Sequence, residues 1–560
     1  MPSQAAPATN GQAPIVAPPA KALAEFLQPL RIDAALIHKL AQDLSETFVH
    51  LAANSDDQFL PTPISQSILS HPIDDITSGP HLAIDIGGTN LRVAFVELAH
   101  DAPQDSEAEN QPLRRHLEHS WPIGEHLKNE NAKGLFAWIG ARIAQVVAKA
   151  CAQQLRGIAA ATELPLGVTF SFPMDQETLN TASLRQMGKG FAITSRLDLG
   201  QHLLDGYESS RGKLPRIRIA AITNDAVATL LSFMHQFSAS STSRTATAAA
   251  AIQRRPVMGL ICGTGCNATV FMGLGGLKQS KRPKKVQTLP GDGGGGGEQL
   301  SIAVNTEWSI NGSAGPLRNN GLVSRWDDMV SAAAEKPGFQ PLEYMTAGLY
   351  LGEIGRLALV DYLTNVLRKD PKAFPEKLLR RFEPRNTTFL SHFSPGQDGN
   401  WSGLVDRLND EFPTGGAQRP LEGIENRPTA TAAAAGFRWT EDMAQALYHI
   451  ARAIEFRAAG IIAASTVGLL RCSGALPSAA ELAAAGAAEL HLGVGYTGGC
   501  ITNFQDYLQH CQELLDELVA REYGDDDGCS TRVRIVLEPC HDGGIDGAGI
   551  LVPAAVASGI

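Results

Sequence analysis

The sequence lacks several features that would assign it to a special class of protein. Its eight cysteines form no Cys-x-x-Cys pair, and Cys262 and Cys266 have no histidine nearby in sequence to complete a zinc set. We therefore expect reduced thiols in an intracellular protein. No run of about 18 apolar residues is evident, so no membrane span is expected. Residues 1–20 are rich in Pro and Ala and show no signal-peptide pattern.

Charge of one sign is also not concentrated in any long block. The 560 residues carry a net charge of −11, with 44% hydrophobic and 19% charged residues, as in an ordinary soluble globular protein. Such a chain is long enough for two or more domains. Its negative charge argues against general binding to nucleic acid or anionic membranes and favours the cytoplasm.

Helical and strand patterns alternate along most of the chain. Apolar residues recur at helical spacing from Lys21 to Leu51, and the Pro-punctuated connector FLPTPISQSILSHPIDD follows. Short apolar runs such as IRIAAIT and VRIVLEP then alternate with helical segments. This alternation predicts an α/β architecture whose sheets are covered on both faces.

Three segments of biased composition are expected to be surface inserts. They cover 101–111, 238–252 and 279–297. The GGGGG run in the third lacks the Gly-Lys-Ser/Thr ending of a phosphate-binding P-loop. The cluster KRPKK (281–285) resembles a nuclear-import or anion-binding patch, although a solvated basic loop is the simpler interpretation.

The segment HLAIDIGGTNLRVAFVEL places Asp85 inside a run that otherwise resembles a buried strand. Burying a carboxylate is costly unless a partner is present, and Gly87-Gly88 would let backbone N–H groups approach an anion. We expect Asp85 to face hydrated Mg²⁺ and Gly87–Asn90 to fold around phosphate oxygens. An ordinary hairpin turn is the alternative.

Two further segments place polar residues after apolar strands. In AAITNDAVATLL, Asp225 would lie at the carboxyl end of a strand and could act as a general base. Alternatively, it is a helix N-cap, and one residue can fill both roles. In MGLICGTGCNATVFM, a Gly turn carries Thr264 and Asn267, and with the first hairpin it could clamp a polyphosphate.

Carboxylates and amides also gather in VNTEWSING and EKPGFQPLEYM. These segments contribute Asn305, Glu307, Gln340 and Glu343. Such groups suit a polyol because each sugar hydroxyl can donate one hydrogen bond and accept another. A helix cap for Asn305 and a plain surface position for the glutamates are the alternatives.

The order of these motifs resembles the eukaryotic, fungal-type hexokinase family of the sugar kinase/actin/heat-shock-protein superfamily. The resemblance runs from about Leu60 to the C-terminus through IDIGGTNLRV, LGVTFSFPMDQ, GKGF, TNDAVATL, GLICGTGCNATV and VNTEW. It implies a two-domain actin-like ATPase (ribonuclease H-like) fold with a ligand cleft between the domains. The implied parts are a tail (1–20), lead-in helices and connector (21–80), a small domain (81–223 with a C-terminal helix 546–560), and a large domain (224–545).

The resemblance also implies roles for individual residues. Asp225 is the implied base for the 6-hydroxyl, and Lys189 binds the sugar and stabilises charge during transfer. Asp85 holds Mg²⁺ through water. The implied sugar site comprises Ser171, Phe172, Pro173, Lys189, Asn224, Asp225, Asn267, Glu307, Gln340 and Glu343. The implied ATP site comprises Asp85, Gly87, Gly88, Thr89, Asn90, Arg92, Thr264, Gly265, Gly498 and Gly543.

Three places depart from the family pattern. Met187-Gly188 replaces Trp-Thr before Lys189, and Gly499 stands near an expected Ser in HLGVGYTGGCITNF. In EPCHDGGIDGAGILVPAAVA, Gly544 replaces Ser, Ile545 replaces Gly, and Asp546 stands where Lys or Arg is common. Ile545 would crowd a nucleotide there, and Asp546 would repel its phosphates.

The resemblance therefore predicts an ATP- and Mg²⁺-dependent hexokinase acting on glucose or a related hexose. The alternative is a hexokinase-like sugar sensor or regulatory protein with weak or absent transfer, acting through protein partners. The KRPKK loop would admit a nuclear location beside the cytoplasmic one.

Overall fold

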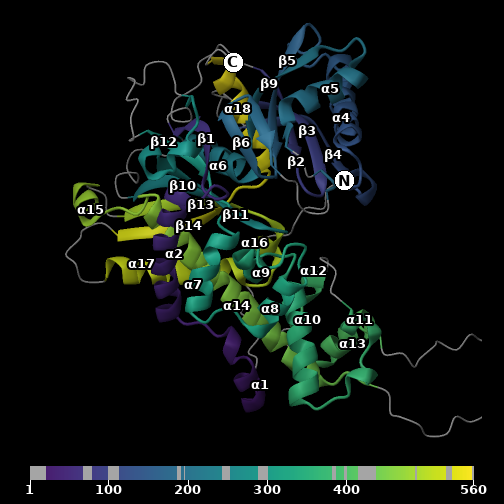
Figure 1. The fold of residues 1–560 in the computed structure, drawn as a ribbon, viewed down its shortest axis with the longest axis vertical. Coiled ribbons are helices and arrows are strands. Elements are labelled where there is room, and N and C mark those ends of the chain that lie inside the picture. Colours follow the sequence, from purple (N-terminus) through teal and green to yellow (C-terminus); the bar gives the residue numbers. More distant parts are fainter. Residues whose placement is uncertain are drawn as a thin grey trace, which may run out of the picture.

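The computed structural model is a two-lobed α/β protein in which strands and helices alternate along the chain (Figure 1). It describes residues 20–66, 79–98, 113–185, 191–193, 196–242, 252–287, 300–380, 386–395, 400–413, 437–485, 489–524 and 532–557. The described part confirms the predicted α/β class.

The smaller lobe is built on a five-stranded sheet. Its strand order is β4 (Leu113–Pro122), β3 (Asn90–Leu98), β2 (His81–Ile86), β5 (Glu163–Phe170) and β9 (Arg216–Thr223). Strands β2, β5 and β9 are parallel, whereas β3 and β4 are antiparallel to their neighbours. Because side chains alternate along a strand, Leu82, Ile84 and Ile86 join the core under α4 (Ala132–Ala152) and α5 (Leu199–Arg211), while Ala83 contacts α18 (Gly543–Ala557).

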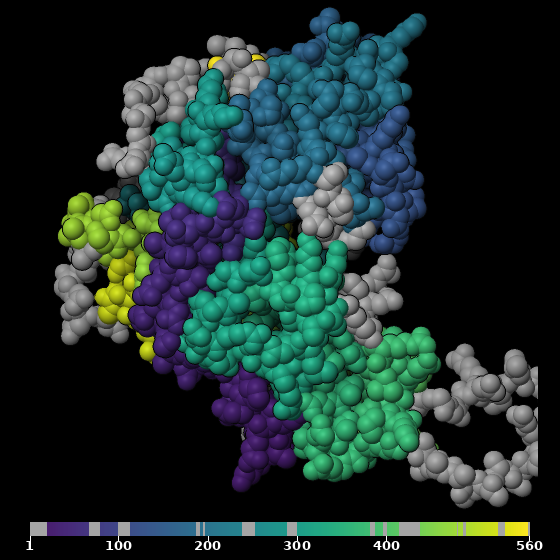
Figure 2. All heavy atoms as spheres, in the orientation of Figure 1, coloured from purple at the N-terminus to yellow at the C-terminus, as the bar shows by residue number. Residues whose placement is uncertain are grey.

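The larger lobe is built on a six-stranded sheet. Its order is β1 (Leu60–Ser65), β12 (Ser301–Asn305), β11 (Cys266–Gly273), β10 (Ile252–Cys262), β13 (Glu489–Thr497) and β14 (Arg532–Pro539). The long helix α14 (Glu441–Cys472) packs against α2 (Ala34–Asn54) and α17 (Tyr507–Tyr523). In the space-filling view the purple N-terminal segment lies along the teal and green surface of this lobe (Figure 2).

The remaining elements are short. A third sheet contains β6 (Met174–Thr178), β7 (Thr181–Leu184) and β8 (Leu197–Asp198). The other α-helices are α1 (Lys21–Phe26), α3 (Glu125–Lys128), α6 (Asp225–Thr242), α7 (Ala314–Asn319), α8 (Arg325–Ala332), α9 (Pro341–Thr346), α10 (Leu351–Asp361), α11 (Glu376–Leu379), α12 (Asn386–Ser391), α13 (Ser402–Glu411), α15 (Ala479–Ala485) and α16 (Gly499–Asn503). A π-helical turn covers Tyr362–Val366, and 3-10 turns cover Gln28–Leu30, Leu274–Gly276, Gln279–Lys281, Asn311–Ser313 and Pro371–Ala373.

The connector expected after α2 contains a strand that the sequence pattern did not predict. Strand β1 pairs with β12, with Pro61 opposite Val304. Its two prolines are tolerated because β1 lies at the edge of the sheet, where its outer side forms only a short bridge with Gln287.

Helices α6 and α18 pack against each other at very short range. Added Cβ atoms at Gly543 and Gly547 would collide with the backbone of Thr229 and Ala228, respectively. The glycines therefore let α18 lie close to α6. Helix α18 begins at Gly543 rather than at the expected residue 546, and it also packs on β2, β5 and β9.

Two helices within the described residues are long and apolar enough to cross a membrane by length and composition, contrary to the expectation from the sequence. They are α4, whose apolar window is 50% buried in the protein, and α14, whose window is 89% buried. Core helices pass the same test, and the packing of α14 against α2 and α17 accounts for its apolar character.

Candidate active site

Three parallel strands of the smaller lobe bring separate motifs to one sheet edge. Asp85 in β2 lies opposite Thr169 in β5, and Thr169 lies opposite Thr223 in β9. Ser171 follows β5, and Asn224-Asp225 follow β9, so these side chains lie at the carboxyl edge. Open α/β sheets bind their ligands at this edge.

Asp225 is the first residue of α6, so the N-cap position lies at Asn224 instead, and Asp225 still has an oxygen available. Its Oδ1 accepts a hydrogen bond from the Ala226 N–H at 2.9 Å, and Asn224 Oδ1 accepts from the same N–H at 2.8 Å. The second carboxylate oxygen of Asp225 has no hydrogen-bond partner within the described part of the chain. The N-cap interpretation of Asp225 is therefore wrong by one residue, while its available oxygen is compatible with the role of general base.

Asp85 lies among several charged groups. Arg92 donates to its Oδ2 from Nη2 at 2.7 Å and from Nε at 3.2 Å, and the Asp85 side chain is 13% exposed. Burial raises the pKa of Asp85; Arg92 opposes this rise, whereas the negative charges of Asp225 and Asp542 add to it. A cation beside Asp85 would offset the negative charges of these neighbouring carboxylates.

This arrangement fits Mg²⁺ bound largely through water. No set of three or more His, Cys, Asp or Glu side chains within the described ranges is arranged to hold a metal directly. Mg²⁺ usually keeps several waters and takes one or two carboxylates together with substrate phosphates. Asp85 can supply one such carboxylate.

An ion-pair network that the motifs did not reveal joins β3, β4 and the start of α18. Arg92 Nη1 donates to Asp542 Oδ1 at 2.5 Å, and Arg115 Nη1 donates to Asp542 Oδ2 at 2.7 Å. Arg115 also donates to Glu118 at 3.1 Å. Asp542 lies within the segment EPCHDGGIDGAGILVPAAVA, but no local pattern marked Arg115, which comes more than 400 residues earlier in the chain.

The expectations for Ile545 and Asp546 are wrong in this structure. Ile545 is fully buried against Ala83 and Val96, because the first turn of α18 directs it toward the sheet. Asp546 is 4% exposed, and its Oδ1 lies 3.4 Å from Arg115 Nε. Burial raises the pKa of Asp546 to about 7 despite Arg115, so at neutral pH this carboxyl group is only partly ionised.

The replacement of Ser by Gly544 has a steric explanation. An added Cβ at this position would lie 2.5 Å from Asp85 Oδ2. The Gly544 carbonyl also accepts a hydrogen bond from Thr169 Oγ1 at 2.7 Å. Glycine therefore allows the start of α18 to approach the Asp85 carboxylate.

Both Gly hairpins leave backbone N–H groups available. Gly87 N–H donates to the Asn90 carbonyl at 2.9 Å, and Gly263 N–H donates to the Gly265 carbonyl at 2.9 Å. Within the described ranges, the N–H groups at the hairpin tips have no hydrogen-bond acceptor; these are at Gly88, Thr89, Thr264 and Gly265. Such groups can bind phosphate oxygens.

Gly498 lies beside the second hairpin. Strands β10 and β13 are parallel with Ile261 opposite Thr497, so the hairpin and Gly498 follow at the same edge. Gly498 has φ 118°, and an added Cβ would collide with the Cys262 carbonyl. The structure thus brings together two of the segments expected to bind ATP, while Gly543 packs on α6.

The predicted sugar-binding residues of the larger lobe form a hydrogen-bonded set. Asn267 Nδ2 donates to Asn305 Oδ1 at 2.8 Å, and Asn305 Nδ2 donates to Glu307 Oε1 at 2.9 Å. Glu307 has φ 46°, in the left-handed region. Asn305, considered earlier as a helix cap, begins no helix and instead joins Asn267 to Glu307.

Glu343 accepts a hydrogen bond from the second hairpin, whereas the side chain of Gln340 accepts a long one from Tyr350. Cys266 N–H donates to Glu343 Oε2 at 2.9 Å, and an added Cβ at Gly265 would lie 2.7 Å from the same oxygen. Gln340 Oε1 accepts from Tyr350 OH at 3.5 Å.

In the Ser-Phe-Pro segment, Ser171 and Pro173 lie partly at the surface and Phe172 lies in the core. Ser171 and Pro173 are half-buried, and Ser171 N–H donates to the Ile86 carbonyl at 3.0 Å. The Phe172 side chain is 2% exposed and packs against Phe170 and Phe191, so it supports the wall from the core side. Lys189 and Met187-Gly188 lie outside the described residues.

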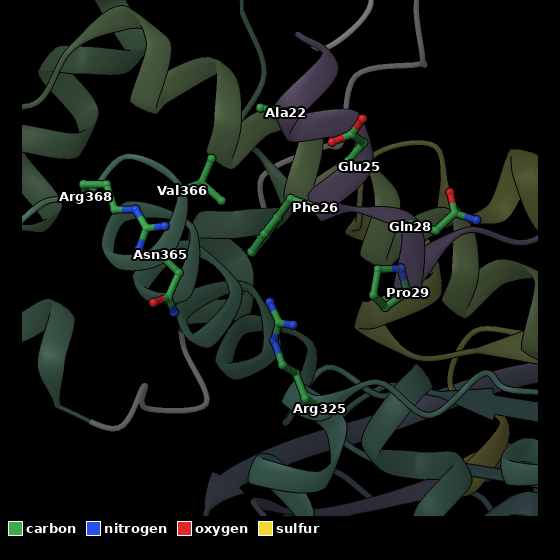
Figure 3. A pocket seen from close by; sticks show the side chains of 9 residues that line it. All are labelled: Ala22, Glu25, Phe26, Gln28, Pro29, Arg325, Asn365, Val366 and Arg368. Carbon is green, nitrogen blue, oxygen red and sulfur yellow. The ribbon is translucent and has the colours of Figure 1, made fainter.

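Two surface cavities contain none of the predicted site residues. One, of about 560 Å³, lies between α1 and the π-helical turn and is lined by Phe26, Arg325 and Arg368 among others (Figure 3). The other, of about 800 Å³, lies near the ends of α4 and α5. The seven described cysteines are free thiols.

Comparison with known protein families identifies two hexokinase family models along the chain. One, described as "Hexokinase", matches residues 22–235, and the other, also "Hexokinase", matches residues 257–554. The first match ends within α6, and the second begins within β10. The insert predicted at 238–252 begins later than expected, because α6 continues to Thr242.

Curated relatives include hexokinases of fungi and animals. A hexokinase of Emericella nidulans is 32% identical over 305 residues, covering 53% of this chain and 51% of the relative. A hexokinase of Kluyveromyces lactis is 28% identical over 298 residues, covering 52% of each. Hexokinase-2 of Homo sapiens is 28% identical over 332 residues, covering 58% of this chain and 30% of the relative. The chain thus spans about half the length of the first curated relatives that it matches.

Solved structures establish the fold. A hexokinase from Schistosoma mansoni complexed with glucose superposes with a TM-score of 0.67 at 19% identity, covering 95% of this chain and 98% of that one. A second hexokinase structure gives a TM-score of 0.60 at 18% identity, covering 95% and 98%. The predicted two-domain actin-like ATPase fold is therefore confirmed.

Proposed function

The chain belongs to the hexokinase family, and we propose on that basis that it transfers a phosphoryl group from ATP to the 6-hydroxyl of glucose or a related hexose. The observation that carries the proposal is Asp225, whose available oxygen lies at the strand edge that also holds Asp85. The glucose-bound relative supports glucose as the first hexose to test.

Asp225 is the proposed general base. Its Oδ1 is fixed by the Ala226 N–H, which leaves the other oxygen to take the proton of the 6-hydroxyl. The hydroxyl oxygen then bonds to the γ-phosphorus as the bond from that phosphorus to the β,γ-bridging oxygen breaks, releasing ADP. Such transfer depends mainly on positioning and charge stabilisation.

The Asn267–Asn305–Glu307 set is the proposed site for the sugar hydroxyls, together with Glu343, Gln340, Asn224 and Ser171. Amides and carboxylates that are already oriented by one another offer both donors and acceptors to hydroxyl groups. A hexose that lacked one of these hydroxyls would leave a buried polar group without a partner.

The two Gly hairpins are the proposed site for the ATP phosphates, with Arg92 beside the first. Mg²⁺, when bound, would neutralise phosphate charge. Asp85 would hold it through water, since its own carboxylate is paired with Arg92 and adjoins two other acids.

No specific observation favours the sensor alternative. Ile545 and Asp546, which had suggested a damaged nucleotide site, are buried in the protein. In the KRPKK segment, Lys281 donates to the Gln58 and Phe59 carbonyls, Arg282 donates to the Leu277 carbonyl, and Lys284 pairs with Glu177 at 2.7 Å. Three of its four basic side chains are thus engaged within the protein.

The direct test is a coupled phosphorylation assay with purified protein, Mg²⁺-ATP and glucose. We expect turnover in the parent and its loss in Asp225→Ala, with glucose affinity changed far less. Turnover at the same rate in Asp225→Ala would refute the assigned base, and absence of turnover in the parent would refute the proposed activity.

A further inference from the structure

Glu307 and Phe59 both have a left-handed backbone conformation, and a hydrogen bond joins the segments that contain them. Glu307 has φ 46° and Phe59, in the bend between α2 and β1, has φ 53°. Side chains with a Cβ rarely adopt this region, and such positions persist only when their surroundings hold them. Phe59 N–H donates to the Thr306 carbonyl at 2.8 Å, which joins the two bends.

Gln58 holds the Glu307 backbone directly. Its Nε2 donates to the Glu307 carbonyl at 2.9 Å, and its Oε1 accepts from the Gly312 N–H at 3.0 Å. The Gln58 side chain is buried, with the residue 2% exposed. An added Cβ at Gly312 would collide with Gln58 Oε1, so the backbone at Gly312 packs directly against the Gln58 side-chain amide.

Lys281 supports the same bend through the backbone carbonyls of Gln58 and Phe59. Its ammonium donates to the Gln58 carbonyl at 2.6 Å and to the Phe59 carbonyl at 3.0 Å. Ser55, which ends α2, accepts from the Gln58 N–H at 3.1 Å. The first residue of the basic KRPKK segment thus has a defined place in the fold.

We propose that Gln58, braced by Lys281, is a positioning residue that fixes Glu307 for hexose binding. This inference rests on the proposed function, in which Glu307 binds sugar hydroxyls. Gln58 holds the Glu307 main chain, while Asn305 and Asn267 hold its carboxylate at 2.9 and 3.3 Å. Loss of the Gln58 bond to the Glu307 main chain would displace the Glu307 carboxylate. The side-chain amides of Asn305 and Asn267, which donate to this carboxylate, would then shift as well.

The test compares Gln58→Met with Thr62→Val, a matched control on β1. Methionine keeps the length of the side chain but neither hydrogen bond. Thr62 is also buried and donates to the Ala303 carbonyl at 2.8 Å, so its loss loosens the same β1–β12 pairing without touching Glu307. Calorimetric titration with glucose gives affinity, steady-state kinetics give KM and kcat, and thermal unfolding reports stability.

We expect Gln58→Met to weaken glucose binding about tenfold, the change that corresponds to loss of one well-placed hydrogen bond. The KM for ATP should stay within about twofold, and Thr62→Val should leave both constants within about twofold. Lys281→Met should weaken glucose binding by about two- to fivefold, since it acts one step further away. A Gln58→Met affinity no weaker than that of Thr62→Val would overturn the inference.

A double-mutant cycle separates positioning from general destabilisation. In the Glu307→Gln background, adding Gln58→Met should weaken glucose binding by no more than about threefold, because the carboxylate it positions is already gone. An undiminished tenfold effect there would refute action through Glu307. If the parent itself bound no glucose, the proposed function would fall as well; if the parent bound glucose and Gln58→Met matched it, only this inference would fall.

Discussion

At the scale of single residues, Asp225 joins a structural and a chemical role in one carboxylate. Asn in its place keeps an oxygen to accept from the Ala226 N–H but loses the basic oxygen. We therefore expect Asp225→Asn to reduce kcat by about 10²- to 10⁴-fold with almost unchanged thermal stability. A large fall in the unfolding temperature beside a small fall in kcat would show that the main role of Asp225 is to stabilise the start of α6.

Gly544 matters for its small size, because it leaves room for the Asp85 carboxylate. A methyl group there would meet Asp85 Oδ2 at 2.5 Å and push the carboxylate from its place beside Arg92. Gly544→Ala should raise the concentration of Mg²⁺ needed for half-maximal rate, while glucose affinity stays the same. An unchanged Mg²⁺ dependence would mean that the local backbone absorbs the methyl group without moving Asp85.

Asp546 should make stability depend on pH. Its pKa is about 7 in the folded protein, whereas an unfolded aspartate titrates near 4. The folded state then binds more protons between these values, so the free energy of unfolding falls as pH rises from about 4 to 7. Asp546→Asn should become more stable than the parent across this window, by at most about 4 kcal/mol above pH 7.

Asp542 is the matched control for that titration, because its shift has the opposite sign. Burial opposes its charge, but Arg115 and Arg92 prevail and lower the pKa of Asp542. Its stabilising contribution is present above the pKa of an unfolded aspartate and is lost as pH falls. Asp542→Asn should therefore lose most stability near neutral pH. Denaturant unfolding of both variants at several pH values would check the two signs, and parallel curves would contradict them.

At the scale of elements, the close approach of α6 and α18 depends on glycine. A Cβ at Gly547 would collide with the Ala228 backbone, so Gly547→Ala must push the two helices apart. We expect a loss of about 1–3 kcal/mol in the free energy of unfolding, as for other overpacked sites. Gly315 in α7 has no atom near its Cβ position, so Gly315→Ala should be neutral or stabilising by up to about 1 kcal/mol. Equal effects of the two substitutions would contradict the packing argument.

The sequence predicted elements best where the signal is local. The runs before Asp85, Ser171 and Asn224 are apolar strands followed by polar residues, so their place at a strand end follows from neighbouring residues alone. The strand in the connector was missed because its two prolines argue for a loop, and only the edge position of β1 makes them acceptable.

Contacts between distant segments could not be predicted in this way. Arg115 meets Asp542, and Gln58 meets Glu307, across hundreds of residues and without a motif at the first partner. Ile545 was misjudged for the same reason. Its neighbours in sequence suggest a ligand-binding turn, whereas its neighbours in space, Ala83 and Val96, make it part of the core.

At the scale of the whole molecule, one apolar cluster connects the two sheets. It contains Ala221 from β9, Ala303 from β12, Leu231 from α6 and Leu551 from α18, all fully buried. Because both lobes lose apolar burial if this cluster opens, we expect them to unfold together. Scanning calorimetry of the parent should show a single transition.

Leu551→Ala tests this coupling from the cluster itself. It should cost about 2–5 kcal/mol, as for other buried Leu→Ala changes, and lower the whole transition. Leu203→Ala is the matched control, because Leu203 is equally buried but belongs to the core under α4 and α5. If the lobes are coupled, both variants should shift one common transition by similar amounts. Two resolved transitions in the parent, with Leu203→Ala moving only one of them, would show that the shared cluster does not bind the lobes into one cooperative unit.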